Sequence, residues 1–382
     1  MIHLKKITLF VLLMFIFVHC TEIYNPNIST GTEALIVEGL ITDGNGPFTV
    51  KLTKAVPISF DSVVSSKTVS DASLTITDNE NNTYTLTNAG SGKYTTPTGF
   101  KAQIGNSYVL HIQTSDGNVY VSKPQKLPAP QTYDSIRGYN TTQGYLNSAN
   151  ELINVNGADI RIDLYTSVGN VDSVPPCRFK SNITLQYNYV AYEPDTIAWN
   201  WFFFGWKSFD LSETENITEG KISATNMSIT NHSLGFVPFE SSSYNVVAPA
   251  YASKSYYLRI NQYTMNNDSY RFYKAAVNQL SASGKIFDPV TAQLYGNMSC
   301  VNHPSKIVLG LFEVSSQTQS AILAINESLI KKVKVQLVPY VKDIPSVKEY
   351  YYKQWDSDPT EFPVKDSLQY VVIPFPSWWY HY

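Results

Sequence analysis

The chain has 382 residues, a formal net charge of −3 and no long basic run, so nucleic-acid binding has no electrostatic support. Hydrophobic residues make up 43% and aromatic residues 13%, and the length is more than one hydrophobic core normally serves. Charged residues are scarce at 15%, and 27 tyrosines with many Thr, Ser and Asn suit the half-buried surface of strands. We therefore expect a mainly β protein with two domains.

The first twenty residues have the pattern of an export signal. Two lysines precede an apolar run over residues 7–18, which is too short for a stable membrane span but has the size of a signal-peptide core. The run ends at Cys20, as in the lipobox of bacterial lipoproteins, where the cysteine is diacylated. Lipoboxes normally have Gly, Ala or Ser before the cysteine, and this chain has His19, so an ordinary signal peptide cut nearby is the alternative. We expect a lipoprotein signal peptide over 1–19, lipid on Cys20 and a tether over 20–34.

Residues 35–122 show short strands separated by turns. Apolar and polar residues alternate with the period of a half-buried strand at Phe48–Leu52, Leu74–Ile76 and Tyr108–Ile112. Glycine-containing turn signals fall between these segments, of which Asp116-Gly117 is a typical hairpin turn. About seven strands at this spacing predict a small immunoglobulin-like β-sandwich.

A second, larger β-rich domain is expected over residues 131–382. Prolines in Lys123–Pro130 predict a stiff linker before it, because proline removes ladder donors. Alternation continues in this domain, and from Cys177 onward one parity is apolar. Arg178 falls on the other, polar parity.

One amphipathic helix is expected in this domain. Its apolar stripe is Tyr270, Tyr273, Val277 and Leu280. We expect Asn267 or Asp268 to cap its N-terminus and Gly284 to end it. The simplest role for a lone helix here is to cover an open sheet face or edge.

The two cysteines that remain after Cys20 are Cys177 and Cys300. Export permits a disulfide between them, and two buried free thiols would give the same sequence pattern. Both alternatives stay open at this stage.

No catalytic or metal-binding motif is found in the chain, so we expect neither an enzyme nor a cofactor. The acidic segment Asp78–Asn82 and the acids near Asp356 could offer oxygens to calcium, but they lack a calcium-loop signature and solvated loop acids are expected. A hydrolase site assembled by folding would have to bring His232 or His303 to a carboxylate and a serine.

The aromatic clusters are the features that indicate contact with a partner. Exposed aromatic side chains supply large, rigid contact areas, and the alternative for each cluster is packing within the protein. The candidate binding residues are Trp199, Trp201, Trp206, Trp378 and Trp379.

Several segments, in order, resemble a family of Bacteroidota outer-membrane lipoproteins known as domain of unknown function 4249. The matching segments are Leu35–Asp43, Gly46–Leu52, Ser73–Asp78, Gly92–Tyr94, Ser269–Lys274, Phe287–Pro289, Gly296-Asn297 and Val308–Phe312. Members look like outer-membrane lipoproteins, often encoded beside a TonB-dependent receptor. The resemblance establishes no catalytic or binding residue.

The resemblance implies a lipid-anchored outer-membrane protein, displayed at the cell surface, that acts as an accessory or binding subunit of a TonB-dependent receptor or another β-barrel. One alternative is a free-standing surface lipoprotein that binds glycans or peptides through the tryptophan clusters. The other is the hydrolase with a site assembled from distant residues.

Overall fold

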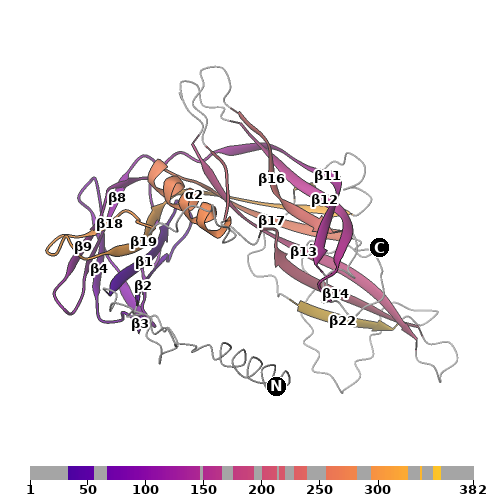
Figure 1. Ribbon diagram of the computed structural model, residues 1–382, viewed down its shortest axis with the longest axis horizontal. Coiled ribbons are helices and arrows are strands. Elements are labelled where there is room, and N and C mark those ends of the chain that lie inside the picture. The colour runs from indigo at the N-terminus through magenta and orange to yellow at the C-terminus, as the bar shows by residue number, and fades with distance from the viewer. Residues whose placement is uncertain are drawn as a thin grey trace, which may run out of the picture.

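The computed structural model describes residues 33–55, 67–146, 149–165, 175–192, 200–212, 215–219, 228–238, 255–281, 294–325, 336–337 and 347–353. Within these residues the chain is mainly β and has a single helix, α2 (Asn267–Ser281). This confirms the predicted fold class. Figure 1 shows one group of sheets on the left, a second on the right and α2 between them.

The first group is a pair of sheets that share one hydrophobic core. One sheet has the order β19 (Val308–Val314), β1 (Ala34–Ile41), β2 (Thr49–Ala55), β7 (Lys93–Thr95) and β6 (Thr87–Gly90), with β3 (Lys67–Thr68) on β2. The other has the order β18 (Met298–Cys300), β9 (Val119–Ser122), β8 (Ser107–Gln113), β4 (Ser73–Asp78) and β5 (Thr83–Thr85), with β10 (Gln125–Lys126) on β8. Alternating side chains such as Leu74, Ile76, Leu110 and Ile112 fill the space between the sheets. We call this pair the N-terminal unit.

Two strands of the N-terminal unit come from far along the chain. β19 pairs with β1 in parallel, with Leu35 opposite Val308, and β18 pairs with β9. Residues 298–314 therefore belong to this unit, and the predicted boundaries of 35–122 and 131–382 are wrong in that respect. These two pairings cover the outer edges of β1 and β9. They could not be predicted, because a pairing between distant segments leaves no local signal in the sequence. The immunoglobulin-like topology stays a prediction.

The predicted linker over residues 123–130 is also part of the N-terminal unit. β10 pairs with β8, and Leu127 is completely buried in the core. The prolines therefore shape a segment that packs on the sandwich, and the prediction of a separate linker is wrong.

The second group is again a pair of sheets around one core, and we call it the C-terminal unit. A three-stranded sheet has the order β11 (Thr132–Leu146), β12 (Leu152–Tyr165) and β16 (Ser228–Pro238). The larger sheet has the order β21 (Gln336–Leu337), β20 (Ser316–Ile325), β17 (Ser255–Thr264), β13 (Cys177–Tyr192), β14 (Asn200–Asp210) and β22 (Val347–Lys353), with β15 (Asn216–Ile217) on β13. Side chains that include Ile160, Ile162, Phe179 and Ile260 form the shared core.

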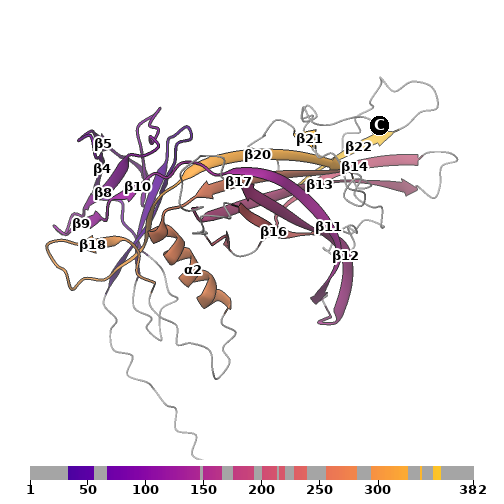
Figure 2. The same cartoon turned by 90° about the horizontal axis from the view of Figure 1, so that it is seen from above.

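The two units are joined closely at one place. β20 follows β19 with only Ser315 between them, so an almost continuous ribbon passes from one unit to the other (Figure 2). α2 lies against β19 of one unit and β15 of the other. The helix therefore covers the seam between the units.

The residue that caps the helix lies one position before the expected Asn267. The side-chain Oδ1 of Asn266 accepts a hydrogen bond from the Ser269 backbone amide at 3.0 Å, so Asn266 is the cap, and Asn267 and Asp268 are not. Tyr273 of the predicted stripe lies at the seam, whereas Leu280 is exposed. Gly284 lies outside the described residues.

Candidate functional site

The structure does not describe the side chains of the predicted lipidation residue or of the predicted binding tryptophans. Cys20, Trp199, Trp378 and Trp379 lie outside the described residues. Trp201 and Trp206 belong to β14, whose backbone pairs with β13 and β22. The proposed roles of these residues stay predictions.

The two cysteines are free and buried in different places. Cys177 belongs to the core of the C-terminal unit and Cys300 to that of the N-terminal unit. The disulfide alternative is therefore wrong, because the two thiols serve two separate cores. Burial raises the pKa of the Cys177 thiol to about 12, so it stays protonated and unreactive at neutral pH.

His232, one of the two histidines of the hydrolase hypothesis, bonds to an amide side chain in the described part of the chain. His232 Nε2 contacts Asn216 Oδ1, and Ser233 donates its hydroxyl hydrogen to Asp159 instead. Burial lowers the pKa of His232, and its ring packs against Phe179 with centroids 5.4 Å apart. His232 thus has a packing role in this structure.

In the segment that could have offered oxygens to calcium, the carboxylate oxygens of Asp78 already accept hydrogen bonds from neighbouring residues. Asp78 accepts the backbone amides of Glu80 and Asn82 at 2.9 Å, the Asn82 side-chain amide at 2.9 Å and the Tyr84 hydroxyl at 3.3 Å. The carboxylate therefore stabilises the β4–β5 hairpin. Across the described part of the chain, no three His, Cys, Asp or Glu residues are arranged to hold a metal ion.

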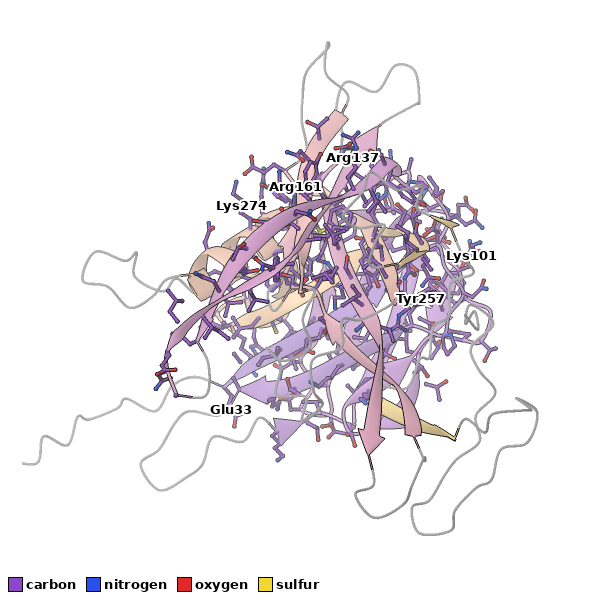
Figure 3. All side chains as sticks on the ribbon, turned by 90° about the vertical axis from the view of Figure 1, so that its right-hand side faces the viewer. Glu33, Lys101, Arg137, Arg161, Tyr257 and Lys274 are labelled. Carbon is purple, nitrogen blue, oxygen red and sulfur yellow. The ribbon has the colours of Figure 1, made fainter. Side chains whose placement is uncertain are left out.

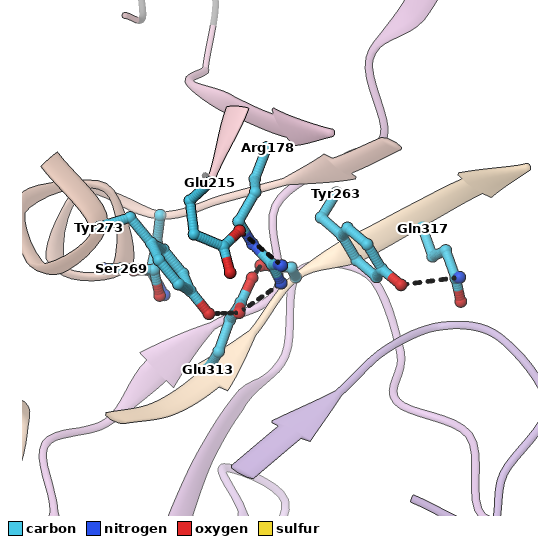
Figure 4. Close-up of polar contacts among 9 residues, drawn as sticks. Arg178, Glu215, Tyr263, Ser269, Tyr273, Glu313 and Gln317 are labelled. Atoms are coloured by element: carbon cyan, nitrogen blue, oxygen red, sulfur yellow. Dashed lines mark hydrogen bonds and ion pairs between the residues drawn. The ribbon is translucent and has the colours of Figure 1, made fainter. Parts of the chain in front are cut away.

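The most strongly built polar site lies at the seam between the units (Figure 4). Arg178 of β13 and Glu313 of β19 form an ion pair with Nη2 and Oε2 2.8 Å apart, and each side chain is only 2% exposed. The guanidinium also lies over the rings of Tyr263 and Tyr273, 4.6 Å from each centroid. Two aromatic faces and a carboxylate thus replace the water that a buried cation loses.

Further hydrogen bonds hold the carboxylate of Glu313 in place. The Tyr273 hydroxyl of α2 donates to Oε2 at 2.6 Å, and the Ser315 hydroxyl donates to Oε1 at 2.7 Å. Glu215, before β15, lies 3.4 Å from Nη1 of Arg178. Residues from both units and from the helix therefore meet in one network, which we call the seam cluster: Arg178, Glu215, Tyr263, Tyr273, Glu313 and Ser315.

The electrostatics of the seam cluster favour its charged form. Burial opposes the charge on Arg178, but Glu313, Tyr273, Glu215 and Tyr263 together outweigh it, and the pKa of Arg178 rises above its ordinary value. Burial, followed by the negative charge of Glu313, raises the pKa of Tyr273. The phenol is therefore a fixed donor, and neither Arg178 nor Tyr273 is poised to exchange a proton near neutral pH.

Local sequence pattern does not predict the seam cluster. Arg178 shares the polar parity of its strand with Lys180 and Asn182, and yet its side chain is buried. The usable signal was Glu313, a carboxylate inside the apolar strand VLGLFEV. A buried acid of that kind requires a cation, and the fold supplies it 135 residues earlier.

A second polar network lies on the outer face of the three-stranded sheet. Asp163 accepts the backbone amide of Asn231 at 2.6 Å and the Ser135 hydroxyl at 2.7 Å, and it pairs with Arg137 at 2.8 Å. Burial disfavours the charge on Asp163, yet these three partners together hold its pKa below the ordinary value.

The neighbouring positions on the same face carry an exposed aromatic ring. Asp159 holds Arg161 at 2.6 Å, and the Arg161 guanidinium lies 5.1 Å from the ring centre of Tyr139. Figure 3 places Arg137 and Arg161 near each other on this side of the molecule. The arrangement is a polar surface with a fixed aromatic ring.

The fold and these two networks define the class of the molecule: a mainly β protein made of two sandwiched units that are locked together through buried charge. None of the residues that the structure describes forms a helix with the length and hydropathy that a membrane span requires. A family model described as a domain of unknown function (DUF4249) matches residues 21–321, and the chain belongs to this family. No curated protein and no solved structure matched the chain.

Proposed function

We propose that this protein is a lipid-anchored outer-membrane protein, displayed at the cell surface, that serves as a non-enzymatic accessory or binding subunit of a TonB-dependent receptor or transport system. The observation that carries the proposal is the seam cluster. Its buried charges hold two sandwiches in one fixed arrangement, which is the task of a scaffold. General acid–base catalysis needs groups that gain and lose protons near neutral pH, and the pKa values of Arg178 and Tyr273 are both raised away from that range.

The anchoring part of the proposal rests on the leader that ends at Cys20. β1 begins at Ala34, so residues 20–33 connect the lipid to the body. A chain of this length reaches at most about 50 Å when fully extended. The tether would keep the body within reach of a neighbouring protein embedded in the same membrane, which supports a lateral partner.

Co-purification tests the proposal directly. The tagged protein is expressed in its own host, extracted from outer membranes in mild detergent and analysed by mass spectrometry. We expect a β-barrel receptor in near-equal amount. A Cys20→Ser variant is the matched control, since it keeps the body and loses the proposed anchor.

Two outcomes would contradict the partner claim. One is recovery of the anchored protein alone from outer membranes. The other is saturable binding of a glycan by the purified protein without any barrel, lost on Trp201→Ala with the fold intact, which would favour the free-standing binding protein.

A further inference from the structure

The β11–β12 hairpin ends in a pair of exposed leucines. Leu146 is the last residue of β11, Leu152 is the first residue of β12, and the two lie directly opposite each other. Their side chains are 69% and 72% exposed. A single exposed apolar residue such as Ile104 is ordinary on a protein surface, but two directly opposite residues on neighbouring strands form one continuous apolar patch.

The end of α2 carries a third exposed leucine on the same side of the molecule. Leu280 lies in the last turn of α2 and is 69% exposed. In Figure 2 the end of the β11–β12 hairpin and the C-terminal end of α2 both point to the lower side of the view. We call this side of the molecule, which carries Leu146, Leu152 and Leu280, the leucine side.

The N-terminal segment also joins the body on the leucine side. Glu33 is the first residue that the structure describes, and β1 begins at Ala34. In Figure 3 the leucine side is on the left, where Glu33 lies, whereas Lys101 lies on the opposite side. Residues 20–33, with the proposed lipid at Cys20, therefore attach to the side of the body that exposes these leucines.

We propose that the leucine side rests on the membrane and that Leu146 and Leu152 insert into the lipid surface as a second contact. The inference rests on the lipid anchor proposed at Cys20, which supplies the first contact. A few leucines bind a membrane only weakly, but a tether that ends on their side raises the effective concentration of lipid around them. The body then has one orientation, in which Lys101 faces away from the membrane.

The chemistry of the hairpin end fits neutral lipid. Residues 146–152 (LNSANEL) contain one acid, Glu151, and no base. Attraction to anionic headgroups depends on lysine and arginine, so the contact is expected to come from burial of apolar surface. It should therefore form on phosphatidylcholine vesicles and should not weaken when salt is added.

A fluorescent probe tests the contact independently of the native lipid. The complete chain from residue 20 onward, with Cys20→Ser and an N-terminal His tag, is bound to phosphatidylcholine vesicles that contain a nickel-chelating lipid. The environment-sensitive dye NBD is attached to Ala149→Cys, between the two leucines, while the buried Cys177 and Cys300 stay unlabelled. We expect a blue shift on vesicle binding and at least about twofold quenching by lipids that carry a spin label near the headgroup.

Two matched controls separate insertion from mere proximity. The same dye on Lys101→Cys, on the opposite side of the body, should show neither change. Leu146→Ser combined with Leu152→Ser should remove most of the quenching at position 149, whereas Ile104→Ser should leave it unchanged. Circular dichroism and vesicle flotation confirm that each variant is folded and bound.

Two results would overturn the proposal. One is equal quenching of the probes at positions 149 and 101, and the other is quenching at position 149 that survives both serine substitutions. A native protein that incorporates no palmitate would contradict the anchor at Cys20 alone, because the His-tagged protein does not depend on that lipid. The failure of the anchor and the failure of the leucine contact are thus distinguishable.

Discussion

Arg178 and Glu313 form a 2.8 Å ion pair at the seam of the two units, and each side chain is only 2% exposed to solvent. One comes from the larger sheet of the C-terminal unit and the other from the strand that completes the N-terminal unit. A charge buried in this way is stable only while its partner stays. The pair therefore makes the folding of each unit depend on the other.

Replacing Glu313 with Gln should destabilise the protein severely. The buried guanidinium would lose its counter-charge, at a cost of about 3–5 kcal/mol of unfolding free energy. Urea unfolding followed by tryptophan fluorescence measures the change.

Glu38→Gln on the adjacent strand β1 is the control. Its ion pair with Lys51 is 3.5 Å long and exposed, so a change of only about 0–1 kcal/mol is expected. A loss at Glu313 no larger than that at Glu38 would mean that the seam cluster does not join the units.

Acid should weaken the outer face of the three-stranded sheet. The pKa of Asp163 is held below its ordinary value of 3.8 in the folded protein, so its contribution to stability is fully present above that value. The contribution is lost as the pH falls below about 4 and through the folded pKa. We expect the unfolding midpoint of the wild type to fall over this range.

Asp163→Asn isolates this effect. The variant should be less stable than the wild type at pH 7, and its stability should change less between pH 5 and pH 3. An acid dependence identical to that of the wild type would show that Asp163 is not part of the cause.

Gly310 should tolerate no side chain. Its φ is +85°, and a Cβ placed there would lie 2.0 Å from the carbonyl oxygen of Val37 in the parallel partner strand. Gly310→Ala should cost more than about 4 kcal/mol or give no folded protein, because the β1–β19 pairing must open.

Gly117→Ala separates this clash from backbone strain. Gly117 has a similar φ of +80°, but a Cβ there meets nothing within 4 Å, so only the left-handed conformation is penalised, by about 1–2 kcal/mol. Equal losses of thermal stability at the two positions would contradict the close strand approach.

The N-terminal unit should not fold from its own residues. A fragment of residues 20–130 lacks β18 and β19, which supply Met298, Cys300, Val308, Phe312 and Val314 to the core. We expect the fragment to show no cooperative thermal transition. Adding a peptide of residues 294–316 should restore one, and a scrambled peptide should not; cooperative unfolding of the fragment alone would refute the assignment of these strands.

Local pattern was enough to predict the strands with one buried face. Leu74 and Ile76, or Leu110 and Ile112, alternate as expected and are almost fully buried. The family resemblance was also found from short segments, and the match over residues 21–321 confirms it.

What local pattern could not predict was which distant segments meet. Arg178 follows the polar parity of its strand, but Tyr273 of α2 and Glu313 of β19 pack against its side chain and bury it. The β1–β19 pairing joins residues more than 270 positions apart, so no periodicity in either strand indicates it. For the candidate site, the sequence indicates only that Glu313 in its apolar strand needs a cationic partner. It does not indicate that this partner is Arg178.

The measurement that tests the central claim most directly is metabolic labelling with radioactive palmitate in the native host. We predict that the protein incorporates label and fractionates with outer membranes, and that Cys20→Ser loses both the label and the membrane association. An unlabelled wild type, together with a Cys20→Ser variant that still fractionates with outer membranes, would contradict a lipid-anchored protein.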